Sequence, residues 1–166
     1  MPKNTMFSFI SIPRNAKELC AMPEYHMKSP FARAALTVLV LCQCTSSLDD
    51  TVEMLHLLLG PSALSTADIS KLQKELNGRE YIPYSYFANA TPENGYEPSL
   101  PLVIAIRDTA FSYQEPGYAT LYVQSSGAET PRSIQLRKKE STGEWFLWEQ
   151  KLLDPIEEPQ GSDPYR

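Results

Sequence analysis

The chain has 166 residues, of which 42% are hydrophobic and 21% charged, so it is long enough to bury a hydrophobic core as a single domain. Its formal net charge of -5 comes from the second half, because residues 1–78 carry seven basic and seven acidic side chains and residues 79–166 carry eight and thirteen. This acidic balance argues against binding to nucleic acid or to an anionic membrane.

The first 28 residues carry only weak signals. Met6–Ile12 alternates apolar and polar residues imperfectly, which predicts a short extended segment that ends at Pro13. Asn15–Met22 predicts one or two helical turns.

Three main helices are predicted next, and each begins with a capping signal. The first follows Ser29 and Pro30 and is apolar almost all round, with Arg33 and Thr37 on its only polar stripe, so it belongs in the centre of the core. The second ends at a Gly-Pro pair, and the third begins with capping-box-like spacing. The three helices are expected from Phe31 to about Cys44, from Asp50 to Leu59 and from Ser65 to Leu76.

Residues 79–101 separate this helical half from a half with a strand pattern. The run contains four prolines and five aromatic residues, and Gly95 can adopt a positive φ. Prolines at this density exclude a long helix or a central strand, and a disordered linker would be poor in aromatic rings. We therefore expect an ordered loop whose rings pack into the seam between the two halves.

After this loop the hydrophobic period changes to two, which indicates strands. The turn Glu140–Gly143 reverses the chain between the last two of them. The fold class is therefore α+β: three main N-terminal helices packed on a C-terminal antiparallel sheet of about four strands. The predicted layers of this single domain are residues 1–78 (helices), 79–101 (loop), 102–153 (sheet) and 154–166 (an extended or mobile tail).

A set of motifs runs through the central loop and the C-terminal half of the chain. The motifs are Tyr81-x-Pro-x-Ser-Tyr-Phe, Ala90-Thr-Pro-Glu-Asn94, Tyr96-x-Pro-x-x-Pro101, Arg132, Leu136–Lys139, Gly143–Glu149 and Asp163–Tyr165. Together they resemble an uncharacterised bacterial family, mostly from Firmicutes, that is known only as a domain of unknown function. The resemblance runs from about Leu55 to the C-terminus and implies a shared fold, but it provides no catalytic residues. Family members tend to have Gly at the position of Asn89, which fits a left-handed backbone that Asn also tolerates.

The sequence contains no pattern typical of a catalytic or cofactor site. It has no nucleophile elbow, phosphate-binding glycine loop or dinucleotide fingerprint, and neither His26 nor His56 has a second ligand at a metal spacing. We therefore predict no catalytic residue, no cofactor and no metal, and a structural, hydrogen-bonded role for His56. The three cysteines, Cys20, Cys42 and Cys44, are expected to be free thiols, which favours the cytoplasm.

Aromatic residues supply the strongest functional signal. With Leu121 and Val123 facing the core, Tyr118 and Tyr122 would point outward, near Arg137 and one ring from the segment Trp145–Trp148. This pattern favours a non-catalytic interaction or regulatory module, although the N-terminal segment, the loop or the tail could cover the same face. The predicted interaction surface consists of Tyr84, Tyr86, Tyr96, Tyr118, Tyr122, Arg137 and Trp145.

Two further hypotheses concern charged residues and partners. The triplet Arg137–Lys139 is expected to pair with Glu140 and Glu144 across its hairpin.

An alternative function is that of a small-molecule binder or enzyme, with a pocket at the seam between loop and sheet. The sequence leaves open a protein partner or a homo-oligomer and favours neither nucleic acid nor a membrane. The polar groups of the seam pocket would be Tyr84, Tyr86, Tyr96, Arg107 and Asp108.

Overall fold

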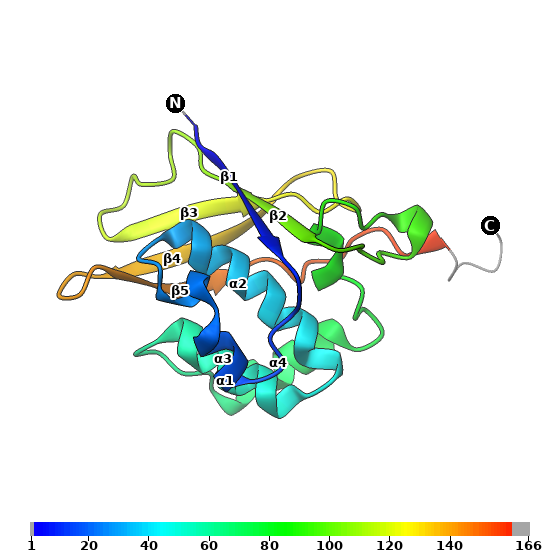
Figure 1. The fold of residues 1–166 in the computed structure, drawn as a ribbon, viewed down its shortest axis with the longest axis horizontal. Helices are drawn as coiled ribbons and strands as arrows, with labels where there is room; N and C mark the ends of the chain where they lie inside the picture. The colour runs from blue at the N-terminus through cyan, green and yellow to red at the C-terminus, as the bar shows by residue number, and fades with distance from the viewer. Residues whose placement is uncertain (1, 161–166) are drawn as a thin grey trace.

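A computed structural model describes residues 2–160 as a helical layer packed on one face of an antiparallel sheet (Figure 1). Four helices and five strands make up these layers, so the α+β class is confirmed. The structure has one strand and one short helix in addition to the three main helices and about four strands that were predicted. The helices are α1 (Ala16–Ala21), α2 (Pro30–Cys42), α3 (Leu48–Leu59) and α4 (Thr66–Leu76). The strands are β1 (Asn4–Phe9), β2 (Leu102–Arg107), β3 (Tyr118–Val123), β4 (Arg132–Lys139) and β5 (Glu144–Gln150).

The additional strand is β1, the weakly patterned N-terminal segment. The sheet order is β1-β2-β3-β4-β5, and β1 pairs antiparallel with β2 from Asn4 opposite Arg107 to Phe9 opposite Leu102. Only Phe9 of this strand is fully buried, so the strand is an edge element that lacks a complete apolar face. Its partner lies about one hundred residues along the chain, and a local pattern cannot reveal such a pairing.

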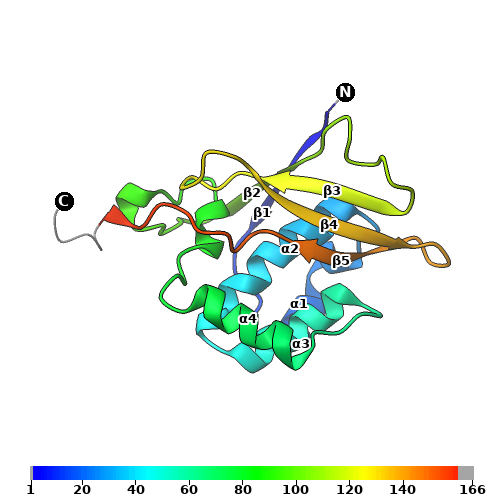
Figure 2. The ribbon, with the colours of Figure 1, turned by 180° about the vertical axis from the view of Figure 1, so that it is seen from behind.

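Helix α2 occupies the centre of the core between the sheet and the other helices (Figure 2). Every residue from Phe31 to Cys42 is buried. The helix begins as predicted, with Pro30 in its first turn and the Ser29 hydroxyl accepting a hydrogen bond from the Ala32 amide at 3.4 Å. A helix that is apolar all round needs such a position, since exposing any of its faces would forfeit burial of hydrophobic surface.

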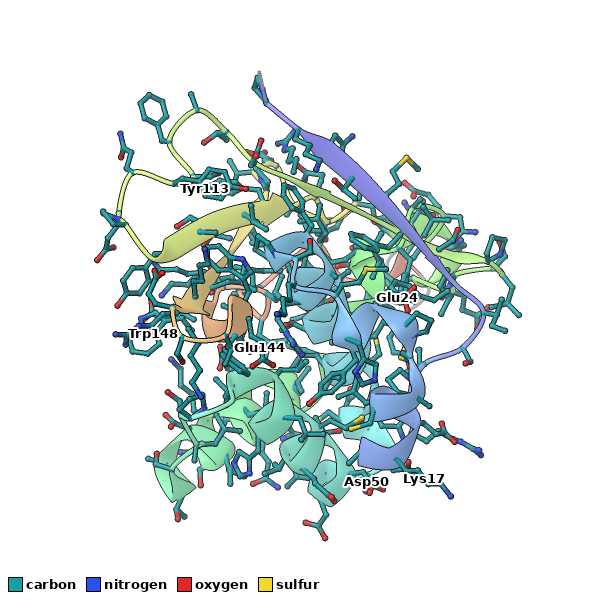
Figure 3. All side chains as sticks on the ribbon, turned by 60° about the vertical axis from the view of Figure 1, so that its left-hand side comes forward. Lys17, Glu24, Asp50, Tyr113, Glu144 and Trp148 are labelled. Atoms are coloured by element: carbon teal, nitrogen blue, oxygen red, sulfur yellow. The ribbon has the colours of Figure 1, made fainter. Side chains whose placement is uncertain are left out.

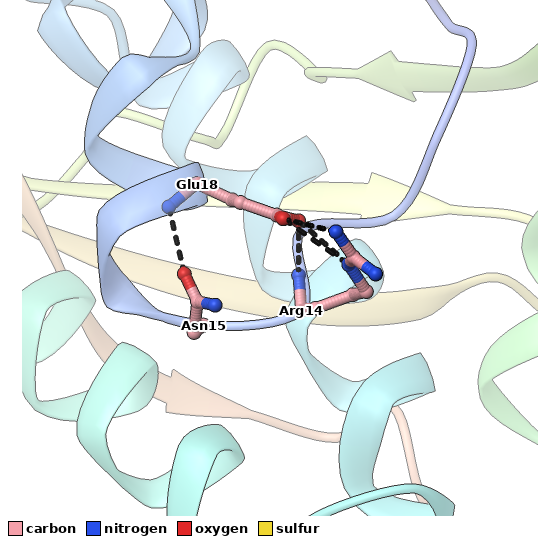
Figure 4. Close-up of polar contacts among 3 residues, drawn as sticks. All are labelled: Arg14, Asn15 and Glu18. Atoms are coloured by element: carbon pink, nitrogen blue, oxygen red, sulfur yellow. Dashed lines mark hydrogen bonds and ion pairs between the residues drawn. The ribbon is translucent and has the colours of Figure 1, made fainter.

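Helix α4 carries its predicted cap, and α1 has a cap that was not predicted. Ser65 and Asp68 form a reciprocal capping box at the start of α4. The Asn15 side chain caps α1 by accepting from the Glu18 amide at 3.0 Å, and the Glu18 carboxylate bonds the Arg14 guanidinium (Figure 4). His56 has the predicted structural role, since its Nε2 accepts a hydrogen bond from the Leu64 amide at 3.2 Å.

The central loop is ordered and its rings fill the seam, as its composition predicted. Tyr86, Phe87 and Tyr96 are buried, and the ring of Tyr81 stacks on that of Tyr96 with centroids 5.5 Å apart. Asn89 differs from expectation because its backbone is not left-handed. Its side chain instead links two parts of the loop, accepting a hydrogen bond from the Ser99 amide at 3.2 Å.

The segment that follows β5 is attached to the rest of the protein as far as residue 160. Pro155 accepts a hydrogen bond from the Arg132 side chain at 2.9 Å, and the Glu157 amide donates to the Gly127 carbonyl at 2.9 Å. Residues 154–160 contain no strand or α-helix, and these contacts attach them to the rest of the domain. The rest of the predicted tail, including the motif Asp163–Tyr165, lies outside the described residues.

Candidate functional site

The outer face of the sheet carries a cluster of one cation and two aromatic rings, which we call the Tyr118 cluster: Tyr118, Arg137 and Trp148. Tyr118 of β3 lies directly opposite Arg137 of β4. The Arg137 guanidinium carbon lies 5.4 Å from the Tyr118 ring centroid and 4.8 Å from that of Trp148, and the two rings meet edge to face at 5.9 Å. Contacts of this kind contribute about 0.5–1 kcal/mol each at exposed sites, so the cluster presents its groups in a defined arrangement.

The ring that β5 contributes to this face is Trp148, whereas the predicted surface contained Trp145. The pairing of β4 with β5 shifts at Gln135 and Leu136, so that Trp148 is the extra residue of a β-bulge. Trp148 is 39% exposed, while Trp145 is half-buried and packs against the core. Side chains alternate along a strand, so Trp145 and the buried Leu147 face the core while Trp148 faces outward; the sequence pattern left open which of these two faces is buried.

A groove of about 420 Å³ adjoins the Tyr118 cluster. Its apolar lining comes from the end of α3 and from β5, including Leu59, Phe146 and Trp148, and its rim comes from Arg137 to Glu140. Phe146 packs against Gly60, which ends α3 with φ 64°. A glycine is required there because a Cβ would lie 2.3 Å from a carbon of the Phe146 ring.

The basic triplet on this rim does not form the ion pairs predicted for it. Lys139 lies opposite Glu144 in the strand register, yet the part of the chain that the structure describes has a single salt bridge, between Arg14 and Glu18. Arg137 instead contacts the rings of its cluster. The groove therefore combines three basic side chains with the single carboxylate of Glu140, on a protein whose net charge is -5.

A second groove, of about 380 Å³, continues along β5 between the sheet and the helices α3 and α4. The two grooves share four lining residues, Leu59, Ser62, Leu147 and Trp148, so they form one depression beside the edge strand. Its charged residues are mixed: Asp68, Lys71, Glu75, Glu149, Lys151 and Asp154.

Two more exposed rings lie in the loop between β2 and β3. Phe111 is 69% exposed and Tyr113 is 48% exposed. Figure 3 shows Tyr113 and Trp148 at the same end of the sheet, where β3 begins. Exposed aromatic rings that gather at one place are typical of a binding surface, whereas single exposed rings are common on any protein.

The structure separates the seven residues predicted for the interaction surface. Tyr118, Tyr122 and Arg137 lie on the outer face of the sheet, and Tyr118 and Arg137 belong to one cluster. Tyr86 and Tyr96 are only 3% and 2% exposed, so they cannot contact a partner in this conformation. Their hydroxyls donate to the backbone carbonyls of Leu152 and Glu157, respectively, and the half-buried Tyr84 donates to that of Cys42.

These loop tyrosines have the electrostatic properties of structural groups. Burial raises the pKa of Tyr96 to about 12 and also raises the pKa values of Tyr84 and Tyr86. Each hydroxyl therefore stays protonated at neutral pH and acts as a hydrogen-bond donor to a carbonyl.

The polar groups predicted for the alternative seam pocket lie in separate surroundings. The seam is filled by the buried rings of Tyr86, Phe87 and Tyr96. Arg107 is exposed, and the Asp108 carboxylate accepts a hydrogen bond from the Lys3 amide at 2.6 Å. Among residues 2–160, no group of three or more His, Cys, Asp or Glu side chains is arranged to hold a metal ion.

The cysteines are free thiols in the structure, as predicted. Cys42 is fully buried in α2, and burial raises the pKa of its thiol well above the ordinary value. A protonated thiol in the core is a poor nucleophile, so Cys42 acts as a small apolar side chain.

The fold and the groove together define an α+β protein with a basic and aromatic surface on its sheet. The chain belongs to the family described as Domain of unknown function (DUF6935), whose sequence profile matches residues 11–160. The match begins well before Leu55, where the resemblance was expected to start. Neither a curated protein nor a solved structure matches the chain. No helix among the described residues is long and apolar enough to cross a membrane.

Proposed function

We propose that this protein is a non-catalytic interaction module that binds an acidic segment of a protein partner on the Tyr118 cluster and the adjoining groove. The observation that carries the proposal is the basic triplet. Lys138 and Lys139 form no ion pair within residues 2–160 and stand beside an apolar groove and an exposed tryptophan. A partner with carboxylates next to one apolar side chain would complement both features.

The outer face is available for such a partner. The described N-terminal segment pairs with β2 at the far edge of the sheet, and the central loop is buried in the seam. Within residues 2–160, neither the N-terminal segment nor the central loop covers Arg137 and Trp148, and both side chains are exposed. Trp and Arg are the residue types most often responsible for binding energy at protein interfaces.

A regulatory role in the bacterial cytoplasm is the setting that we propose for this binding. The free thiols favour a reducing compartment, and the acidic surface outside the groove would disfavour nucleic acid. The expected origin of the family, mostly in Firmicutes, belongs to the same proposal.

The test is selection from a random peptide library displayed on phage against the immobilised full-length protein. We expect enriched peptides to share two or more carboxylates beside an apolar residue. Their binding should fall at least tenfold with Trp148→Ala and with the charge reversal Lys138→Glu/Lys139→Glu. The matched control is Lys17→Glu on α1, which lies away from Trp148 in Figure 3 and should leave binding unchanged.

Three outcomes would overturn the proposal. Selection could yield no enriched motif, or the enriched peptides could bind the Trp148 and lysine variants as well as the wild type. Light scattering could also show a concentration-dependent dimer that Trp148→Ala dissociates, in which case a second copy of the chain occupies the surface.

A further inference from the structure

A buried arginine on the central helix lacks a counter-ion. Arg33 is 4% exposed, although guanidinium groups are rarely buried without a carboxylate partner. Its Nε donates to the Trp145 carbonyl at 2.9 Å, and one terminal nitrogen donates to the Tyr25 carbonyl at 3.3 Å. The other terminal nitrogen, Nη1, is buried and has no hydrogen-bond partner among the described residues.

The groups that surround the guanidinium compensate its charge only in part. The rings of Tyr25 and Phe146 lie 4.9 Å and 5.7 Å from the guanidinium carbon. Glu144 is close enough to favour the charged form but does not form a salt bridge, and burial lowers the pKa of Arg33. Two neutral carbonyls and two rings are weak substitutes for an anion at a buried cation.

A cavity of about 160 Å³ lies beside Arg33, between η1 (Pro23–His26) and the β4–β5 turn. The lining residues are Tyr25, His26, Met27, Lys28, Arg33, Thr142 and Glu144. Figure 3 shows Glu144 between the sheet and the helical layer.

The balance of charge in this cavity favours an anion. Lys28 and Arg33 are cationic, and Glu144 is the only carboxylate that lines the cavity. Lys28 extends across the mouth of the turn, since its Cδ would lie 3.9 Å from a Cβ at Gly143. The Thr142 hydroxyl adds a neutral donor, and His26 uses its Nε2 in a 2.6 Å hydrogen bond with the Cys20 carbonyl.

We infer that this cavity binds a small oxyanion, a phosphate or carboxylate group, beside the Arg33 guanidinium and the Lys28 ammonium. The anion would supply the counter-charge that the buried guanidinium lacks. The cavity shares no lining residue with the groove beside the Tyr118 cluster, and the inference does not depend on the function proposed for that surface.

The inference is tested with inorganic phosphate and with acetate on the full-length protein, using chloride at equal ionic strength as the reference. We expect one of the two oxyanions to raise the melting temperature saturably beyond the effect of chloride. Amide chemical shifts in NMR spectra should change at Met27, Lys28 and Thr142. A response to phosphate alone would assign a phosphate site, and a response to acetate would assign a carboxylate site.

Two charge variants locate the anion without altering Arg33, whose replacement could unfold the protein. Lys28→Met should weaken the apparent Kd by up to about fivefold and Glu144→Gln should tighten it by a similar factor, because single exposed charges have effects of this size. Lys17→Met is the matched control and should leave the apparent Kd unchanged.

Several results would overturn the inference. Chloride could reproduce the entire thermal shift, the chemical shifts could change elsewhere, or Lys28→Met could behave like Lys17→Met. If Glu144 itself serves as the counter-ion, Glu144→Gln would lower the melting temperature without added anion and neither oxyanion would bind.

Discussion

The contact between Gly60 and Phe146 allows a test of how β5 is held against the helical layer. Gly60 has φ 64° and ψ -119°, a conformation that costs a residue with a Cβ about 1–3 kcal/mol. The Cβ of Gly60→Ala would also lie 2.3 Å from a Phe146 ring carbon, so the ring must move. Forced repacking of this kind costs a further 1–3 kcal/mol or so, giving a total loss of about 2–6 kcal/mol.

The matched control is Gly95→Ala. Gly95 has φ 71° and ψ 22°, and no atom of another part of the chain lies within 4 Å of the position that a Cβ would take there. Its substitution should therefore cost only the backbone part, about 1–2 kcal/mol. Unfolding in urea, followed by fluorescence and by circular dichroism, gives both free energies on one scale.

A double variant separates the two contributions at Gly60. In a Phe146→Ala background, Gly60→Ala should cost about 1–3 kcal/mol less than in the wild type, because the ring that it displaces is gone. Equal costs for Gly60→Ala in the two backgrounds would refute the contact between β5 and the end of α3, and with it the shape of the groove.

Three further predictions concern caps, burial and the outer cluster. Ser65→Ala removes the acceptor for the Asp68 amide and should lower the free energy of unfolding in urea by about 1 kcal/mol. Burial raises the pKa of Tyr96 to about 12, whereas its value in the unfolded chain is about 10, so the wild type should lose stability as pH rises from 10 to 12. In urea unfolding measured across that pH range, Tyr96→Phe should lose less stability than the wild type. A double-mutant cycle of Arg137→Ala and Trp148→Ala should give a coupling energy of about 0.5–1 kcal/mol in urea unfolding, and zero coupling would contradict the stacked arrangement.

Local chemistry made much of the fold predictable. Capping residues such as Ser29 and Ser65 act within one turn of their helices, so their sequence neighbours determine the helix starts. The many aromatic residues of segment 79–101 likewise predicted that its rings would be buried, although the composition did not show where. These inferences depended on residues close together in the chain, or on composition alone.

The pairing of β1 and the bulge at Trp148 depend instead on contacts between distant segments. The alternation of Phe7 and Phe9 indicated an extended segment, but not that it pairs with β2 at the edge of the sheet. The bulge at Trp148 places Glu149, rather than Trp148, opposite Gln135 of β4. Hydrophobic alternation has a period of two everywhere and contains no information about where a register shifts.

The candidate site and the buried arginine meet at β5, and their arrangement favours binding through side chains. β5 is an edge strand, and exposed edges invite an added strand. The Arg33 side chain on α2 donates a hydrogen bond to the Trp145 carbonyl, and Phe146 packs on Gly60. The first half of β5 is therefore already in contact with the helical layer. A partner of the Tyr118 cluster would therefore contact the side chains of Trp148 and the basic triplet rather than add a strand along the first half of β5.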